Sequence, residues 1–188
     1  MEHFYQNLGE DYFTYPNLYK EMVDRSPIDA TSHFVEVGCH KGRSASFMGV
    51  EIINSNKKIK FDCVDCWRRD EIYNEFIDNI KPIKDVINVY KEYSINACKH
   101  YSNNSLDFVF IDALHDYASV FDDITHWYPK VKENGIIAGH DFWVNMGRIK
   151  LLPGVVNCVT QIFKDDFITT KEGCWIHTKK KNTIESMI

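Results

Sequence analysis

The 188-residue sequence predicts an α/β fold, with a doubly wound and mostly parallel sheet that ends in an antiparallel hairpin. Short apolar runs rich in β-branched and aromatic residues alternate with longer helical patterns, as successive β-α-β units require. The strands are almost continuously apolar, which is typical of a parallel sheet covered by helices on both faces. No internal repeat or Pro/Gly-rich linker divides the chain, so we expect a single domain.

The parallel strands are assigned to five apolar runs, at residues 33–38, 59–65, 86–91, 106–112 and 135–141. Helical patterns follow the first four runs, at residues 44–54, 70–80, 94–101 and 119–131. Pro153 is suited to the first position of a further helix, and residues 166–170 and 173–179 predict the hairpin. Together these elements predict a Rossmann-like core over residues 31–188. Residues 1–30 predict a helical extension, which either caps the active site or packs against a second subunit in a homodimer.

Composition limits the classes of partner. The net charge of −5 argues against nucleic acid, because phosphate binding needs a basic face. No apolar run is long enough to cross a bilayer, and the acidic, aromatic start lacks the features of a signal peptide. We therefore expect a cytoplasmic protein without a membrane partner. The six cysteines lie mostly in apolar segments, which suits free buried thiols, and the Cys63-x-x-Cys66 pair lacks the second pair of a zinc site.

The first strand leads into a glycine-containing loop, FVEVGCHKGRSASF, at residues 34–47. Gly38 and Gly42 allow a tight turn and close approach of the backbone to a ligand. A dinucleotide-binding loop has a glycine where this chain has Glu36, and a carboxylate there disfavours an anion and favours a cationic cofactor. The alternative is an ordinary glycine-rich turn between a strand and a helix.

The pattern E-x-G-x-x-x-G-x-S, from Glu36 to Ser44, resembles the S-adenosylmethionine loop of class I methyltransferases. The resemblance implies that S-adenosylmethionine is the cofactor. Asp65 ends the second strand, where an acid can accept hydrogen bonds from both ribose hydroxyls of adenosine, or remain a solvated strand-end acid. Trp67 either stacks on the adenine or packs in the core. Ser94 is either a helix N-cap or, by resemblance, also faces the adenine edge.

The segment SLDFVFIDALHDYASVFDDITHWYPKVKENGIIAGHDFW, residues 105–143, resembles the small sugar and antibiotic O-methyltransferases, such as the macrocin O-methyltransferase-like group. The resemblance implies that Asp112 and Asp141, at the ends of two strands, hold magnesium or manganese. Such a cation would lower the pKa of the acceptor hydroxyl. His115 is either the general base or a structural hydrogen-bonding group. Asp112 is also counted among the cofactor-binding residues.

Two positions depart from the pattern of metal-dependent relatives. His140 stands where some relatives have an acid as a further metal ligand, and we include it in the metal set. Phe142 stands where others have asparagine. Two carboxylates, at Asp112 and Asp141, therefore remain as firm ligands.

The resemblance implies methyl transfer from S-adenosylmethionine to a hydroxyl of a small polar acceptor, such as a sugar or glycosylated metabolite. The acceptor is expected between Asp112, Asp141, residues 143–152 and the N-terminal helices. One alternative is a metal-dependent hydrolase that uses Asp112, His115, His140 and Asp141 to activate water. The other is a non-catalytic relative that binds a nucleoside.

Overall fold

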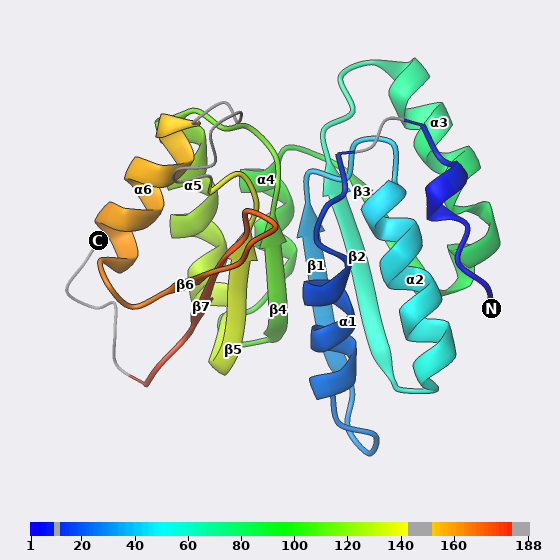
Figure 1. The fold of residues 1–188 in the computed structure, drawn as a ribbon, viewed down its shortest axis with the longest axis horizontal. Coiled ribbons are helices and arrows are strands. Elements are labelled where there is room, and N and C mark those ends of the chain that lie inside the picture. The colour runs from blue at the N-terminus through cyan, green and yellow to red at the C-terminus, as the bar shows by residue number, and fades with distance from the viewer. Residues whose placement is uncertain (10–11, 143–151, 182–188) are drawn as a thin grey trace. The chain divides into compact units, whose positions relative to one another are not determined.

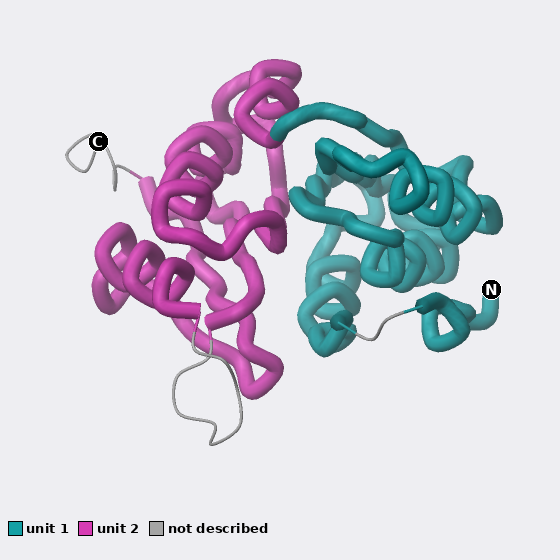
Figure 2. Tube along the Cα trace, turned by 90° about the horizontal axis from the view of Figure 1, so that it is seen from above, with its two compact units in different colours: residues 1–93 teal, residues 94–188 magenta. Residues whose placement is uncertain are grey.

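The computed structural model describes residues 1–9, 12–142 and 152–181 of the chain. The chain divides into two compact units, Met1–Tyr93 and Ser94–Ile188, which Figure 2 shows in separate colours. The predicted fold class is confirmed, because the strands are mostly parallel, the C-terminal strands are antiparallel and helices flank them (Figure 1). Within the described ranges, none of the helices has the length and apolar character that a membrane span needs. The assignment of all 188 residues to one domain stays a prediction.

The first unit contains three parallel strands in the order β3-β2-β1. The apolar side chains of β1 and β2 are buried, as expected for strands covered on both faces, whereas in β3 only Ile87 is buried. The register pairs Glu36 of β1 with Cys63 of β2, so these two side chains lie on the same face. The strands and their connecting helices are β1 (Ser32–Val37), α2 (Arg43–Ser55), β2 (Ile59–Asp65), α3 (Asp70–Ile80), η2 (Lys81–Val86) and β3 (Ile87–Lys91).

The N-terminal extension forms part of the first unit. It consists of a 3-10 turn, η1 (Tyr5–Asn7), and the helix α1 (Pro16–Arg25), which packs against α2. Aromatic rings hold it there, since Phe13 lies 5.3 Å from Phe47 of α2, measured between ring centroids. The Arg43 guanidinium at the start of α2 donates to the carbonyl oxygen of Leu8 at 2.6 Å. The predicted helical extension is therefore confirmed, and its role as a cap or a dimer contact stays a prediction.

The second unit contains four strands in the order β4-β5-β7-β6. The pair β4 and β5 is parallel, whereas β7 is antiparallel to both of its neighbours, as the predicted hairpin requires. Helices α5 and α6 pack against each other, and Pro153 opens α6 as predicted. The elements are α4 (Ser94–Ala97), η3 (Cys98–His100), β4 (Leu106–Ile111), α5 (Tyr117–Trp127), η4 (Tyr128–Lys130), β5 (Val131–Gly139), α6 (Pro153–Phe163), β6 (Ile168–Thr169) and β7 (Trp175–Thr178).

The boundary between α5 and β5 differs from the prediction. The sequence pattern predicts a helix up to residue 131 and a strand from residue 135, whereas α5 ends at Trp127 and β5 begins at Val131. Pro129 explains the early end, because proline has no N–H for the helical hydrogen bond and its ring clashes with the preceding turn. The three residues around it form a 3-10 turn instead.

Candidate active site

The loop after β1 turns sharply at two glycines. Gly38 and Gly42 have φ angles of 93° and 81°, in the left-handed region that favours glycine. The Gly42 N–H donates to the carbonyl oxygen of Cys39 at 2.8 Å, and the Gly42 carbonyl accepts from the Ser46 N–H at 2.8 Å. The predicted tight turn between strand and helix is therefore confirmed. It places the loop directly at the N-terminus of α2, where backbone N–H groups are available to a ligand.

Glu36 and Ser44 are brought together beneath this loop. The Ser44 hydroxyl donates a hydrogen bond to Oε1 of Glu36, and the Glu36 side chain is fully buried. A buried carboxylate requires such donors, because its desolvation is costly. The two residues that the sequence places at the ends of the loop motif therefore support each other, and this contact fixes the position of the acid.

Asp65 joins the loops that follow β1 and β2. Its Oδ2 accepts a hydrogen bond from the His40 N–H at 2.9 Å, and its Oδ1 accepts one from the Trp67 N–H at 2.9 Å. Each carboxylate oxygen can accept a second hydrogen bond, so ribose hydroxyls could be added without displacing either backbone donor. Asp65 is thus a structural residue as well as a predicted cofactor ligand.

Trp67 is buried in the first unit, with 3% of its surface exposed. Its ring packs against Phe76 at 4.4 Å and against Tyr73 at 5.2 Å, both distances between ring centroids. Its Nε1 donates to the His40 carbonyl oxygen at 2.7 Å. These contacts favour the core-packing alternative for Trp67, and stacking on adenine stays a prediction.

Replacing Gly42 by alanine is expected to destabilise the protein by about 2 kcal/mol or more. The added Cβ would lie 2.8 Å from the Phe76 ring and 3.1 Å from Ile80, and φ at this position is positive. Urea unfolding of Gly42→Ala and wild type measures the difference in the free energy of unfolding. A difference within about 0.5 kcal/mol, the range of neutral surface substitutions, would contradict the prediction.

In the second unit, Ser94 stands at the start of α4 and is held by α5. Its Oγ accepts a hydrogen bond from Trp127 Nε1 at 2.8 Å and is also hydrogen-bonded to the carboxylate of Asp123. Burial of Asp123 raises the pKa of its carboxyl to about 6. The sequence prediction missed both partners. Their i, i+4 spacing on a helix is a signal that they share a face, but nothing in the sequence pairs that face with Ser94.

Asp112, His115 and Asp141 lie close together after the ends of β4 and β5. One ligand atom from each lies within 4.8 Å of the others. His115 Nε2 is 2.9 Å from a carboxylate oxygen of Asp141 and 3.6 Å from one of Asp112. Nε2 is buried. Within the described residues, it forms no well-directed hydrogen bond. Asp141, which follows β5, has a φ of 62°, in the left-handed region that residues other than glycine seldom adopt.

His140 is turned so that one ring nitrogen faces the two carboxylates. Its Nε2 lies 2.9 Å from the Glu172 carbonyl oxygen, which accepts a hydrogen bond and thus places the proton on Nε2. Its Nδ1 lies 3.6 Å from Asp141 and 3.9 Å from Asp112. In the neutral ring this nitrogen carries a lone pair, so a cation shared with the carboxylates would suit it. A hydrogen bond that fixes the tautomer in this way is a common feature of metal-binding histidines.

This cluster fits a divalent cation. It combines two carboxylates with Nδ1 of His140, next to His115, and the two negative charges lie close together in a partly buried place. The four residues that the sequence predicts for the catalytic and metal site are thus neighbours, and the metal itself stays a prediction. The donor set of carboxylate oxygen with imidazole suits manganese better than magnesium, which prefers oxygen throughout.

The pKa of His115 rises from 6.5 to about 10 because of the nearby carboxylate of Asp112, followed by that of Asp141. The two negative charges stabilise the imidazolium even where its N–H is imperfectly directed. In the metal-free protein His115 is therefore protonated at neutral pH and cannot accept a proton. A divalent cation held by the same carboxylates would supply the positive charge instead, and would lower the pKa of His115.

The stability that His115 provides to the metal-free protein is expected to fall at high pH. Because its pKa is higher in the folded state, this contribution is fully present below pH 6.5 and is lost as pH rises through about 10. The measurement is the free energy of unfolding in chelator for wild type and His115→Gln, at several pH values from 6 to about 10.5. The advantage of wild type should shrink over this range, and a constant difference would contradict the prediction.

The start of α6 supports the loop that carries His115. Gly154 lies so close that an added Cβ would be 2.3 Å from the His115 carbonyl oxygen and 2.6 Å from the Tyr117 nitrogen. Only glycine permits this approach. The sequence shows the Pro-Gly pair that opens the helix, but it does not reveal that this helix start packs against the site.

Comparisons with known proteins place the chain in a family. A family model described as a methyltransferase domain matches residues 35–142, more than half of the chain. No curated protein matches. Similar solved structures include a methyltransferase of Podospora anserina with bound S-adenosylhomocysteine, at 15% identity and a TM-score of 0.67, covering 88% of this chain and 78% of that one.

Two further solved structures carry O-methyltransferase descriptions. A candidate caffeoyl-CoA O-methyltransferase of Staphylococcus aureus has 14% identity and a TM-score of 0.68, covering 93% of this chain and 87% of that one. A candidate O-methyltransferase of Klebsiella pneumoniae has 10% identity and a TM-score of 0.66, covering 92% and 84%. At these identities the likeness shows the fold. The family model shows more: the chain belongs to the methyltransferase domain family, as a class I S-adenosylmethionine-dependent methyltransferase.

Proposed function

We propose that the protein transfers a methyl group from S-adenosylmethionine to a hydroxyl of a small polar acceptor, such as a sugar or glycosylated metabolite, with help from a divalent cation. The observation that carries this proposal is the cluster of Asp112, His115, His140 and Asp141 at the strand ends of a methyltransferase. Hydroxyl groups are weak nucleophiles at neutral pH, so a methyltransferase that acts on them gains from such a cluster. The O-methyltransferase descriptions of the neighbouring structures agree with it.

The cofactor site is proposed in the first unit. Glu36, buried and held by Ser44, would face the positively charged end of the cofactor, and Gly38 and Gly42 would allow its close approach. Asp65 would accept the ribose hydroxyls. S-adenosylmethionine supplies the methyl group from its sulfonium centre. The positive charge of this centre would be attracted to the carboxylate of Glu36, which stands where a dinucleotide-binding loop has glycine.

The proton of the acceptor hydroxyl is proposed to go to Nε2 of His115. This nitrogen lies next to both carboxylates, and a cation held by them would lower its pKa, so that it would be unprotonated and able to accept the proton. Asp112, Asp141 and Nδ1 of His140 would hold the cation, which lowers the pKa of a bound hydroxyl. These residues would therefore orient the acceptor and stabilise the developing charge on its oxygen.

The proposal is tested by calorimetric titration with S-adenosylhomocysteine, followed by screening acceptors for methylation with and without Mn²⁺. The acceptor panel contains free sugars, glycosylated metabolites and phenols. Saturable binding of one S-adenosylhomocysteine per chain, and cation-stimulated methylation of a sugar hydroxyl, are expected. A folded protein that binds no S-adenosylhomocysteine would overturn the cofactor assignment. Turnover of phenols alone would overturn the acceptor assignment, and hydrolysis of a test ester without cofactor would favour a metal-dependent hydrolase.

A further inference from the structure

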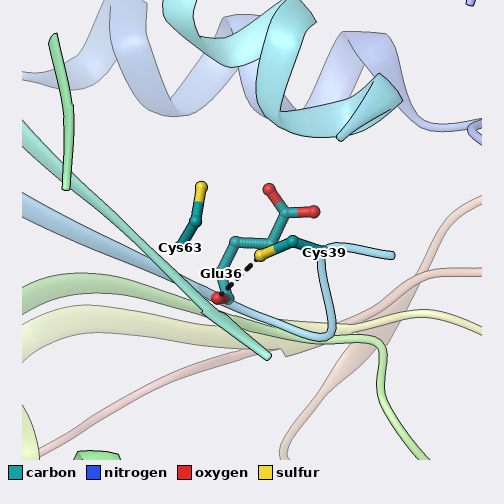
Figure 3. A group of neighbouring side chains, drawn as sticks. All are labelled: Glu36, Cys39 and Cys63. Atoms are coloured by element: carbon teal, nitrogen blue, oxygen red, sulfur yellow. Dashed lines mark hydrogen bonds between the residues drawn. The ribbon is translucent and has the colours of Figure 1, made fainter. Parts of the chain in front are cut away.

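A second group of metal-ligating side chains lies in the first unit. Figure 3 shows Glu36, Cys39 and Cys63 as neighbours, and one ligand atom from each lies within 4.8 Å of the others. Glu36 and Cys63 are partners in the register of β1 and β2, so their side chains share one face of the sheet. Cys39 follows β1 and its thiol donates to the Glu36 carbonyl oxygen at 3.4 Å. The register of the two strands brings Glu36 and Cys63 together, and the turn after β1 places Cys39 beside them.

All three side chains are removed from solvent, with exposed fractions of 0% for Glu36, 2% for Cys39 and 0% for Cys63. Burial raises the pKa of both thiols, so they are protonated at neutral pH in the metal-free protein. Two thiols and a carboxylate form a donor set that disfavours magnesium and favours zinc or cadmium, whose bonds to thiolate sulfur are strong. Three protein ligands leave one position of a tetrahedral ion open.

We propose that Glu36, Cys39 and Cys63 bind a thiolate-preferring divalent metal ion, of the class of Zn²⁺ and Cd²⁺. On binding, the ion forms bonds to Sγ of Cys39, Sγ of Cys63 and a carboxylate oxygen of Glu36. The two thiol protons go to solvent, so one divalent ion replaces two protons. Typical zinc bond lengths put neighbouring ligand atoms roughly 3.5 Å apart. Because the ligand atoms lie within 4.8 Å of one another, no pair would need to approach by more than about 1.3 Å.

Occupancy of this site is expected to oppose cofactor binding, a consequence that rests on the proposed function. Glu36 is the acid assigned to the cofactor, and Cys39 lies between Gly38 and Gly42 in the cofactor loop. A metal ion would neutralise the carboxylate and draw the loop toward β2. We expect the affinity for S-adenosylhomocysteine to fall about 10-fold, within the usual range of coupling between two sites.

The metal site is tested by titrating the reduced full-length protein with Cd²⁺ and recording the ultraviolet charge-transfer absorbance of thiolate bound to cadmium. About one equivalent should saturate the signal in wild type, and the signal should be lost in both Cys39→Ser and Cys63→Ser. Cys66→Ser is the matched control, because Cys66 is the half-buried neighbour of Cys63 in the C-x-x-C pair and should be dispensable. In the second unit the Cys174 thiol lies near Asp112 and Asp141, so Cys174→Ser is the control for cadmium bound at that cluster, and the signal should survive in it.

Absence of the signal in wild type, its survival in both Cys39→Ser and Cys63→Ser, or its loss in Cys66→Ser or Cys174→Ser would overturn the site. X-ray absorption at the cadmium edge of the wild-type complex needs no variant, and we expect two sulfur atoms bound to the ion. One sulfur neighbour or none would also overturn the proposed site. Titration with S-adenosylhomocysteine, with and without Cd²⁺, then tests the antagonism in wild type and Cys63→Ser. Equal affinities in wild type would overturn the antagonism, whereas failure of the metal-free protein to bind S-adenosylhomocysteine would count against the proposed function alone.

Discussion

Replacing Asp112 or Asp141 by asparagine is expected to weaken Mn²⁺ binding by at least about 10²-fold. Loss of a residue that only supports a metal ligand typically costs 10- to 100-fold in affinity, and these residues are proposed as the ligands themselves. The substitution preserves shape but removes one of the two charges that His115 and His140 face. Binding is measured by electron paramagnetic resonance, in which free and bound Mn²⁺ are distinguished, so no acceptor is needed.

Asp116→Asn is the matched control. Asp116 lies on the same loop, but it caps α5 by accepting the Ser119 N–H at 3.0 Å and is exposed. Asparagine is an equally good N-cap, so this variant should keep both its stability and its affinity for Mn²⁺. If Asp112→Asn and Asp141→Asn bind Mn²⁺ as well as Asp116→Asn does, the cluster is not a cation site. His115 would then be a structural ion-pair partner of the two carboxylates.

The sequence predicts the strands and the loop after β1 because their signals are local. Apolar runs bounded by turn residues define strands, and Gly38 and Gly42 show directly where the backbone needs left-handed φ angles. The acid and histidine positions at Asp112, His115 and Asp141 follow from the same logic, since parallel strands bring their carboxyl ends to one edge. The proximity of these three side chains can therefore be predicted from the sequence.

What the sequence could not predict depends on contacts between distant segments. The tautomer of His140 is fixed by the backbone carbonyl of Glu172, a group that no side-chain pattern encodes. The raised pKa of His115 depends on the distances to two carboxylates rather than on its neighbours in sequence. The approach of Cys39 to Cys63 depends likewise on the register between β1 and β2, which a pattern of hydrophobicity leaves undetermined for strands buried on both faces.

Replacing Asp65 by alanine is expected to lower the affinity for S-adenosylhomocysteine about 10²-fold. The proposed ribose hydrogen bonds are charge-assisted, and each such bond contributes roughly 1.5–3 kcal/mol. The loss of two such bonds accounts for a decrease in affinity of about 10²-fold even if their contributions are only partly additive. The measurement is calorimetric titration at a temperature well below the unfolding transition, which keeps loss of folded protein out of the binding constant.

The same substitution should also lower stability, because Asp65 accepts the backbone N–H groups of His40 and Trp67. Asp65→Asn separates the two effects. Its amide oxygen can still accept one backbone N–H, so most of the loop geometry is retained, whereas the negative charge that strengthens the ribose hydrogen bonds is lost. We expect the asparagine variant to recover more stability than affinity relative to alanine.

Asp70→Ala serves as the control for general charge effects near this edge. Asp70 is exposed in the first turn of α3 and pairs with Lys91 at 2.8 Å. Its replacement by alanine changes the net charge by the same amount as Asp65→Ala, but leaves the loops after β1 and β2 untouched. Its affinity for S-adenosylhomocysteine should equal that of wild type. If Asp65→Ala also binds S-adenosylhomocysteine like wild type while melting at a lower temperature, Asp65 only holds the loops together. The ribose would then have to be recognised by another group at the end of β2.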